Sequence, residues 1–243
     1  MKVFAISDLH LSLSAPAYLH SGAEFAVQKP MDIFGEHWQG YLPRLIENWQ
    51  KTVSAKDAVL MCGDTSWAMT LDEAKYDFDF LGKLNGTVYL SRGNHDYWWG
   101  GITKLRTVLP ANVVPLNHDC AVVAGRAVCA TRGWLLPGCS EWKASTDTAI
   151  YLRELLRLEM ALQAGASTGL PLVAMLHYPP FDDENDQGEM MDLLEKYGVS
   201  LCVYGHIHGI CPKSSYYRRI RGIDLYNVSC DRLAFTPLLL WED

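Results

Sequence analysis

Short apolar runs recur along the chain and alternate with segments in which apolar residues repeat at helical spacing. Continuous apolar runs of about four to eight residues are typical of buried strands, and repeats at every third or fourth position are typical of helices that pack on one side. The runs predict strands at Lys2–Ser7, Ala58–Cys62, Thr87–Ser91, Leu172–Leu176 and Leu201–Tyr204. The repeats predict helices at His37–Val53, from Thr70 to Leu84, at Trp98–Leu109, Thr146–Ala164 and Glu189–Tyr197.

The segments outside this alternation predict further strands and one long loop. Two runs, Ala121–Ala124 and Arg126–Ala130, flank a glycine and predict a hairpin. Asp224–Ser229 and Pro237–Trp241 predict two C-terminal strands, which we expect, like the hairpin, to be antiparallel. Leu11–Gly35 has no regular pattern. Apolar strands that alternate with helices imply parallel strands covered on both faces. We therefore expect an α/β fold with a mixed two-sheet core and helices outside, in a single domain over residues 1–243.

Local signals mark the ends of two helices. Thr70 followed by Glu73 matches a capping box and predicts a helix start. Gly165 and Gly169 follow the longest apolar repeat, where left-handed glycines often end a helix.

Polar side chains stand directly after five of the predicted strands. They are Asp8 and His10, Asp64, Asn94 with His95 and Asp96, His177, and His206 with His208. The carboxyl ends of strands in α/β sheets form the edge at which ligands bind, and residues two apart in extended chain point to one side. Buried charge is costly unless it is paired or bound to metal. This pattern therefore predicts a cluster of oxygen and imidazole ligands that suits first-row transition metals.

Other histidines and the cysteines lack such a pattern. A lone histidine is more often a structural residue than a ligand, and we assign His20, His37 and His118 to that class. The seven cysteines are never spaced as C-x-x-C, which argues against a structural zinc site or a disulfide framework.

Charge and hydropathy narrow the possible partners. The formal net charge is −7, which argues against a long nucleic acid, because affinity for duplex comes largely from Lys and Arg. The N-terminal apolar stretch is too short for a signal peptide, and no apolar run approaches the roughly 20 residues that span a bilayer. We expect a cytoplasmic protein with no membrane partner; its oligomeric state is not given by these features.

The ordered series Asp8-x-His10, Gly63-Asp64, Gly93-Asn94-His95-Asp96, His177 and Gly205-His206-x-His208 resembles the calcineurin-like metallophosphoesterase superfamily. The resemblance implies a four-layer α-β-β-α sandwich with two mixed β-sheets and a dinuclear metal site at the carboxyl ends of the strands. By motif position, it implies one ion held by Asp8, His10, Asp64 and His208. Asp64 would bridge to a second ion, held also by Asn94, His177 and His206.

The same resemblance assigns roles to residues beside the ligands. His95 would stand near the leaving-group oxygen as a proton donor, and Asp96 would orient it. Arg92, next to Asn94, is a candidate phosphate clamp, and Arg132 is a weaker one. Two divalent ions, two carboxylates and a bridging hydroxide leave about +1 at the site, which would attract a phosphate ester for in-line attack by that hydroxide.

Several features leave more than one interpretation open. The substrate could be a small phosphomonoester or phosphodiester, and the ions could be divalent or mixed-valence Mn, Fe, Zn or Ni. The Leu11–Gly35 loop could gate the substrate or be a packed insertion. Trp67, Trp134 and Tyr178 could stack on a base or pack the fold, and packing is favoured for Trp98 and Trp99. The acidic run from Asp182 to Asp186 is expected to be a solvated loop. The alternative function is a catalytically silent metal-binding scaffold or protein-interaction module with the same fold.

Overall fold

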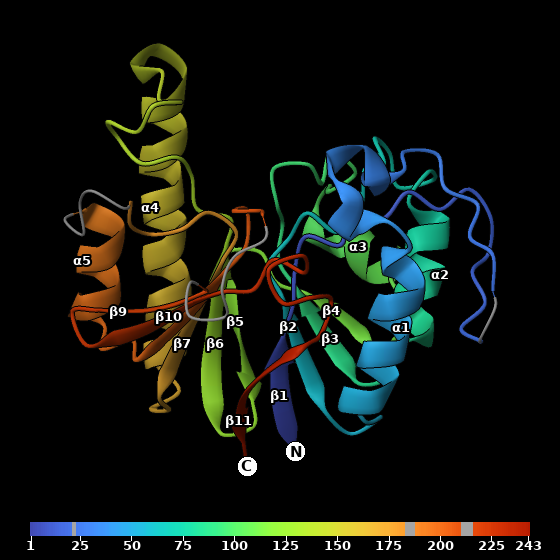
Figure 1. Cartoon of the computed structure of the whole chain (residues 1–243). Helices are drawn as coiled ribbons and strands as arrows, with labels where there is room; N and C mark the ends of the chain where they lie inside the picture. Colours follow the sequence, from blue (N-terminus) through green and yellow to red (C-terminus); the bar gives the residue numbers. More distant parts are fainter. Residues whose placement is uncertain (21–22, 183–187, 210–215) are drawn as a thin grey trace.

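The computed structural model describes residues 1–20, 23–182, 188–209 and 216–243. Within these ranges, two β-sheets stack face to face and helices cover both outer faces (Figure 1). The strand order is β11-β1-β2-β3-β4 in a five-stranded sheet and β5-β6-β7-β8-β10-β9 in a six-stranded sheet. The four-layer sandwich of two mixed sheets is thereby confirmed.

The five-stranded sheet is parallel except at one edge. Strands β1 (Lys2–Ala5), β2 (Ala58–Met61), β3 (Thr87–Leu90) and β4 (Val113–Pro115) run parallel, and β11 (Leu238–Glu242) pairs antiparallel with β1. The first three strands are short because each ends in a polar motif.

The six-stranded sheet contains the predicted hairpin. Strands β5 (Asp119–Val123) and β6 (Arg126–Thr131) are antiparallel and turn at Ala124 and Gly125, which both have positive φ. β7 (Leu172–Leu176) and β8 (Leu201–Tyr204) continue parallel to β6. β10 (Ile223–Asn227) is parallel to β8 and antiparallel to β9 (Tyr217–Ile220). The antiparallel pairing expected for this segment is therefore found with β9 but not with β8.

Helices flank the sheets on opposite sides of the molecule (Figure 1). Beside the five-stranded sheet lie α1 (Tyr41–Thr52), α2 (Lys75–Lys83) and α3 (Ile102–Val108), preceded by the 3₁₀ turns η1 (Met31–Phe34) and η2 (Glu36–Trp38). Beside the six-stranded sheet lie α4 (Ala144–Ala166) and α5 (Glu189–Lys196). No helix in the described ranges combines the length and apolarity needed to cross a bilayer.

The main core fills the space between the two sheets and continues on the outer face of the five-stranded sheet, under α1, α2 and α3. Val3, Val59 and Leu90 from one sheet and Val128 and Val203 from the other belong to one cluster of fully buried side chains. Burying a side chain of this kind stabilises the fold by about 1.5–3 kcal/mol before the entropy cost is counted. A second buried cluster packs α4 and α5 on the outer face of the six-stranded sheet.

The helix boundaries differ from the expectations at four places, and the first is α1, which begins at Tyr41 rather than His37 because the separate 3₁₀ turn η2 precedes it. α3 begins at Ile102 rather than Trp98, and the two tryptophans before it are buried packing residues, as expected. The Thr70 hydroxyl accepts a hydrogen bond from Glu73 N (3.3 Å), but this cap closes a turn and α2 begins only at Lys75. Gly165 lies inside α4 rather than ending it. The position is occupied by glycine for a steric reason, since a Cβ there would lie 2.4 Å from Cys129 Sγ on β6.

The Leu11–Gly35 loop is packed in its first part, around Leu11 and Leu13, whereas Ile33 and Phe34 near its end are exposed. Leu11 and Leu13 are buried, and each forms a β-bridge, to Ser66 and Val27 respectively. The Leu13 amide donates to the buried carboxylate of Asp77 (2.8 Å). The first part of the loop is therefore held by packing near the ends of β1 and β2, while Phe34 near its end lines a cavity with His10 and His95, so both interpretations of the loop stay predictions.

The cysteines and the acidic run were the subject of two further expectations. The six cysteines in the described ranges are free, and Cys211 lies outside these ranges. The acidic run falls mostly outside them as well, with Asp182 as its described member.

Candidate metal centre

The chain leaving β1 pairs with the chain leaving β10, and this joins the two sheets at their carboxyl ends. Ser7 N donates to Val228 O (2.8 Å), and Cys230 N donates to Ser7 O (2.9 Å). Asp8 follows at once and is fully buried at this seam. The polar motifs that follow β2, β3, β7 and β8 lie in the same region as Asp8.

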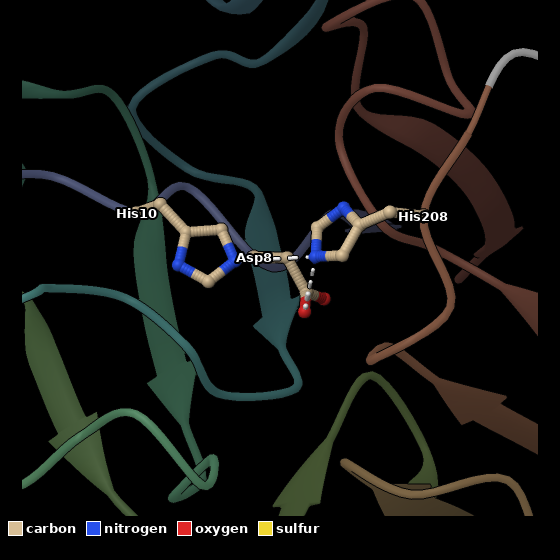
Figure 2. A group of neighbouring side chains, drawn as sticks. All are labelled: Asp8, His10 and His208. Atoms are coloured by element: carbon tan, nitrogen blue, oxygen red, sulfur yellow. Dashed lines mark hydrogen bonds and ion pairs between the residues drawn. The ribbon is translucent and has the colours of Figure 1, made fainter. Parts of the chain in front are cut away.

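Asp8, His10 and His208 form the first group of converging ligand atoms (Figure 2). His10 Nε2 lies 3.2 Å from His208 Nε2, and His208 Nε2 lies 3.6 Å from Asp8 Oδ1. His10 and His208 are 198 residues apart in sequence. Only the folded chain brings them together.

Asp64 and three further residues form a second set next to the first. His177 Nε2 is 2.6 Å from Asn94 Oδ1 and 3.5 Å from Asp64 Oδ2. His206 Nδ1 is 3.1 Å from the same Asn94 oxygen. All seven predicted ligands are thus within one cluster.

Asp64 lies between the two predicted ligand sets, as the predicted bridging role requires. Its Oδ2 is 4.0 Å from His10 Nε2 and 3.5 Å from His177 Nε2, so it faces members of both predicted ligand sets. Asp8 also contacts both sets, because it belongs to the group with His10 and His208 and to a group with Asp64 and His177.

The backbone at this cluster is held in an unusual conformation. Asp8, His10, Asp64 and His206 all have positive φ, between 48° and 68°. Such residues cost of order 1–3 kcal/mol each and persist where the surroundings over-determine them, often at functional sites. The rest of the fold therefore stabilises this arrangement at a cost.

Two glycines allow the loops to approach the carboxylates closely. A Cβ on Gly205 would lie 2.2 Å from Asp8 Oδ2, and one on Gly93 would lie 2.1 Å from Asp64 Oδ1. No larger residue fits at either position without moving a predicted ligand.

The electrostatics of the cluster favour a cation. Burial raises the pKa of Asp8 to about 6 and that of Asp64 to about 7, and burial lowers the pKa of His206 to about 3. Burial therefore makes the two carboxylates resist ionisation and His206 resist protonation, whereas the burial of His208 is outweighed by its hydrogen bond to Asp231, which raises the pKa of His208. Neutral imidazole and ionised carboxylate are the forms that bind metal, and a bound cation stabilises both. The donor set fits two transition-metal ions.

His95 lies beside the cluster, with Nε2 4.0 Å from Asp64 Oδ2. Its backbone amide donates to Asp64 Oδ1 (2.8 Å), which fixes both residues. Burial, and then the charges of His177 and His208, lower the pKa of His95 to about 4. The ring is therefore neutral near pH 7 before substrate binds.

Asp96 does not orient His95 as the resemblance implied. Its fully buried carboxylate accepts hydrogen bonds from Thr65 N (2.9 Å), Gly93 N (2.7 Å) and Trp98 Nε1 (3.1 Å). Within the described ranges, His95 Nδ1 has no hydrogen-bond partner. Asp96 instead links the loop after β2 to the loop after β3 through these hydrogen bonds. The link helps to hold Asp64 and Asn94, which lie in these two loops, in place.

The two arginines lie near the cluster. Arg132 stacks on Trp134 (4.3 Å) and lies 3.6 Å from the buried Glu154 carboxylate, and its charge lowers the pKa of Asp64 against the larger effect of burial. Arg92 is half-buried, and its charge is close enough to lower the pKa of Arg132. A phosphate-binding role for Arg92 stays a prediction.

The calcineurin-like phosphoesterase family model matches residues 1–209. The chain belongs to the calcineurin-like phosphoesterase family. This family membership implies metal-dependent hydrolysis of phosphoesters and a site that typically holds two metal ions.

The structural comparison agrees on the fold. A crystal structure of a protein of unknown function from Aquifex aeolicus is similar, with a TM-score of 0.51 and 15% sequence identity over 98% of this chain and 95% of that chain. A search of the curated proteins finds no match.

Two residues next to the ligand cluster were not singled out as site residues from the sequence. Asp231 is buried and bonds to His208 Nδ1 (3.1 Å) and Gly209 N (2.8 Å), so it orients a predicted ligand. It lies just after a predicted strand, and that position was its one available signal. His37, which we assigned to a structural role, has its Nε2 3.6 Å from Asp231 Oδ2 and lines a cavity beside the site.

Aromatic rings support the imidazoles of the cluster. Trp67 stacks on His10 (4.7 Å between centroids) and also contacts His95 (4.4 Å). Tyr178 lies 4.2 Å from His206. These rings restrict the orientation of each imidazole, as the positioning of ligands and catalytic groups requires.

Proposed function

We propose that this protein is a dinuclear-metal-dependent phosphoric ester hydrolase that acts on a small phosphorylated substrate. The observation that carries the proposal is the convergence of two buried carboxylates, one amide and four histidines from five strand ends. The closeness of these polar groups would be costly in a protein without a cation to bind.

The two ions would be transition metals drawn from Mn, Fe, Zn and Ni, held by the two ligand sets that Asp64 connects. Mixed nitrogen and oxygen donors accept all four metals, and availability decides among them. When bound, such ions would lower the pKa of a water molecule that serves as the nucleophile and would stabilise negative charge on phosphate oxygens.

The chain's own residues would align the substrate and handle the proton. The attacking hydroxide oxygen forms a bond to phosphorus as the bond to the opposite, leaving oxygen breaks. Arg92 supplies a positive charge to the phosphate, and His95 Nε2 gives its proton to the leaving oxygen. The phosphate's negative charge raises the pKa of His95 from its low value in the free protein, so the ring gains that proton as substrate binds.

Metal analysis coupled to phosphatase assays tests the proposal. The purified protein, loaded with Mn²⁺, is expected to hydrolyse p-nitrophenyl phosphate or bis-p-nitrophenyl phosphate, and Asp64→Asn is expected to lose both metal and activity. A protein that binds two equivalents of metal yet hydrolyses neither ester under several metals would instead be the silent scaffold.

A further inference from the structure

Two cavities lie on opposite sides of one wall at the metal centre. The first, which we call the His95 cavity, has a volume of about 340 Å³ and is lined by His10, His95 and His208 among others. The second, which we call the His206 cavity, has a volume of about 290 Å³ and is lined by His206. The first cavity therefore contacts one predicted ligand set and the second contacts the other.

Two short chain segments form the wall between the cavities. Ile207 lines the His206 cavity, whereas the next residue, His208, lines the His95 cavity. In the same way, Asp231 lines the His95 cavity, and the next residue, Arg232, lines the His206 cavity. A phosphate bound at the ligand cluster would have access to a cavity on either side of this wall.

The His95 cavity suits the group that leaves. It contains the proton donor, and the aromatic rings of Phe34, Trp38 and Trp67 line it. An alcohol that takes a proton from His95 must leave on this side, so its organic part lies among these rings.

The His206 cavity suits a group that stays on phosphorus. Trp134, Tyr178 and Phe181 line it, and none of its lining residues stands in the proton-donor position of His95. Among the residues that the structure describes, its charged lining residues are Arg218 and Arg232 against Glu141 and Asp182, which balance in number. Aromatic walls without net charge favour an uncharged organic substituent.

A phosphomonoester has one organic substituent and would leave the His206 cavity unused. We propose that the substrate is a phosphodiester of two small organic groups, with the leaving group in the His95 cavity and the retained group in the His206 cavity. Hydrolysis then yields the alcohol, which carries the proton from His95, and a phosphomonoester of the retained group. Both cavities are near the lower end of the about 300–1,000 Å³ range of small-molecule sites, which argues against a polymer. This inference rests on the proposed hydrolase function.

Two esters with the same leaving group separate the two cavities. p-Nitrophenyl phosphate has no second substituent, and bis-p-nitrophenyl phosphate has one that must occupy the His206 cavity. Ser140→Trp at the exposed rim and Leu135→Trp further along the lining are expected to reduce the diester-to-monoester ratio of kcat/KM by about tenfold or more, which corresponds to about 1.4 kcal/mol. Ser145→Trp, an exposed serine at the start of α4 that lines neither cavity, is the matched control and should keep the wild-type ratio.

Binding gives a second measurement that does not depend on turnover. In a Mn²⁺-loaded His95→Ala background, calorimetry should show that Ser140→Trp and Leu135→Trp weaken the affinity for bis-p-nitrophenyl phosphate, while Ser145→Trp does not. An unchanged ratio and unchanged affinity in both variants would overturn the two-cavity inference, as would an equal loss on both esters. Hydrolysis of neither ester by the wild-type protein would contradict the proposed function itself.

Discussion

A single added methyl group at Gly205 should dismantle the metal centre. An alanine Cβ there would lie 2.2 Å from Asp8 Oδ2 and 2.5 Å from Ser7 Oγ. Carbon–oxygen contacts are normally no shorter than about 3.3 Å, so the Asp8 carboxylate or the loop after β8 must move by about 1 Å. Gly205 has no positive φ, so the effect of alanine is steric and acts directly on a predicted ligand.

The size of the effect follows from this displacement. Metal–ligand distances tolerate only about 0.2 Å, so a shift of about 1 Å removes Asp8 from coordination. Misplacement by about 1 Å can cost about 10²-fold in rate. Overpacking a buried site costs about 1–3 kcal/mol, and each kcal/mol lowers the Tm of a chain of this size by about 2–4 °C.

Three measurements on Gly205→Ala test this reasoning together. Bound metal by plasma mass spectrometry and kcat on a p-nitrophenyl ester should both fall, and calorimetry should show a modest loss of Tm. Gly100→Ala is the matched control, because nothing lies within 4 Å of a Cβ at Gly100. A Gly205→Ala protein with full metal content and wild-type kcat would refute the tight packing on which the site depends.

Three further variants test separate parts of the site and the fold. His95→Ala should lower kcat by about 10²–10⁴-fold with metal content retained, as measured by steady-state kinetics and metal analysis, and full activity would remove its acid role. Asp231→Asn should weaken metal affinity by about 10–100-fold in a competition titration with a chelator, because Asp231 orients His208; unchanged affinity would contradict this. Burial raises the pKa of Asp77 from 3.8 to about 6. The contribution of Asp77 to the free energy of unfolding therefore falls as the pH rises from about 4 to about 6, and above that range the buried, ionised carboxylate destabilises the fold by its full amount. Asp77→Asn removes that cost, so its stability relative to wild type should increase between pH 4 and pH 7 by up to about 3 kcal/mol in urea unfolding, and a difference that does not change with pH would contradict the assignment.

Much of the fold was predictable because its central strands are simple. Strands β1, β2, β3, β7 and β8 are short apolar runs that end in polar motifs, and both features are visible in sequence. Strand β9 was missed because it is an edge strand with the sequence YRRI, whose exposed charged residues show no apolar alternation. Gly165 was misread because the need for glycine arises from Cys129 on a neighbouring strand, which sequence spacing does not reveal.

The ligand cluster was more predictable than its surroundings. The seven predicted ligands occur in recognisable motifs, whereas Asp231 and His37 are single residues outside these motifs. His37 and Asp231 lie beside the ligands only because η2 and the segment after β10 meet next to His208 in the folded chain. The same is true of Asp96, whose hydrogen bonds to two loops depend on how β2 and β3 lie together.

Anomalous diffraction from crystals soaked in Mn²⁺ tests the central claim most directly. Two strong peaks are expected on either side of the Asp64 carboxylate, one coordinated by Asp8, His10 and His208 and the other by Asn94, His177 and His206. A single peak, or none at Asp64, would contradict a dinuclear centre.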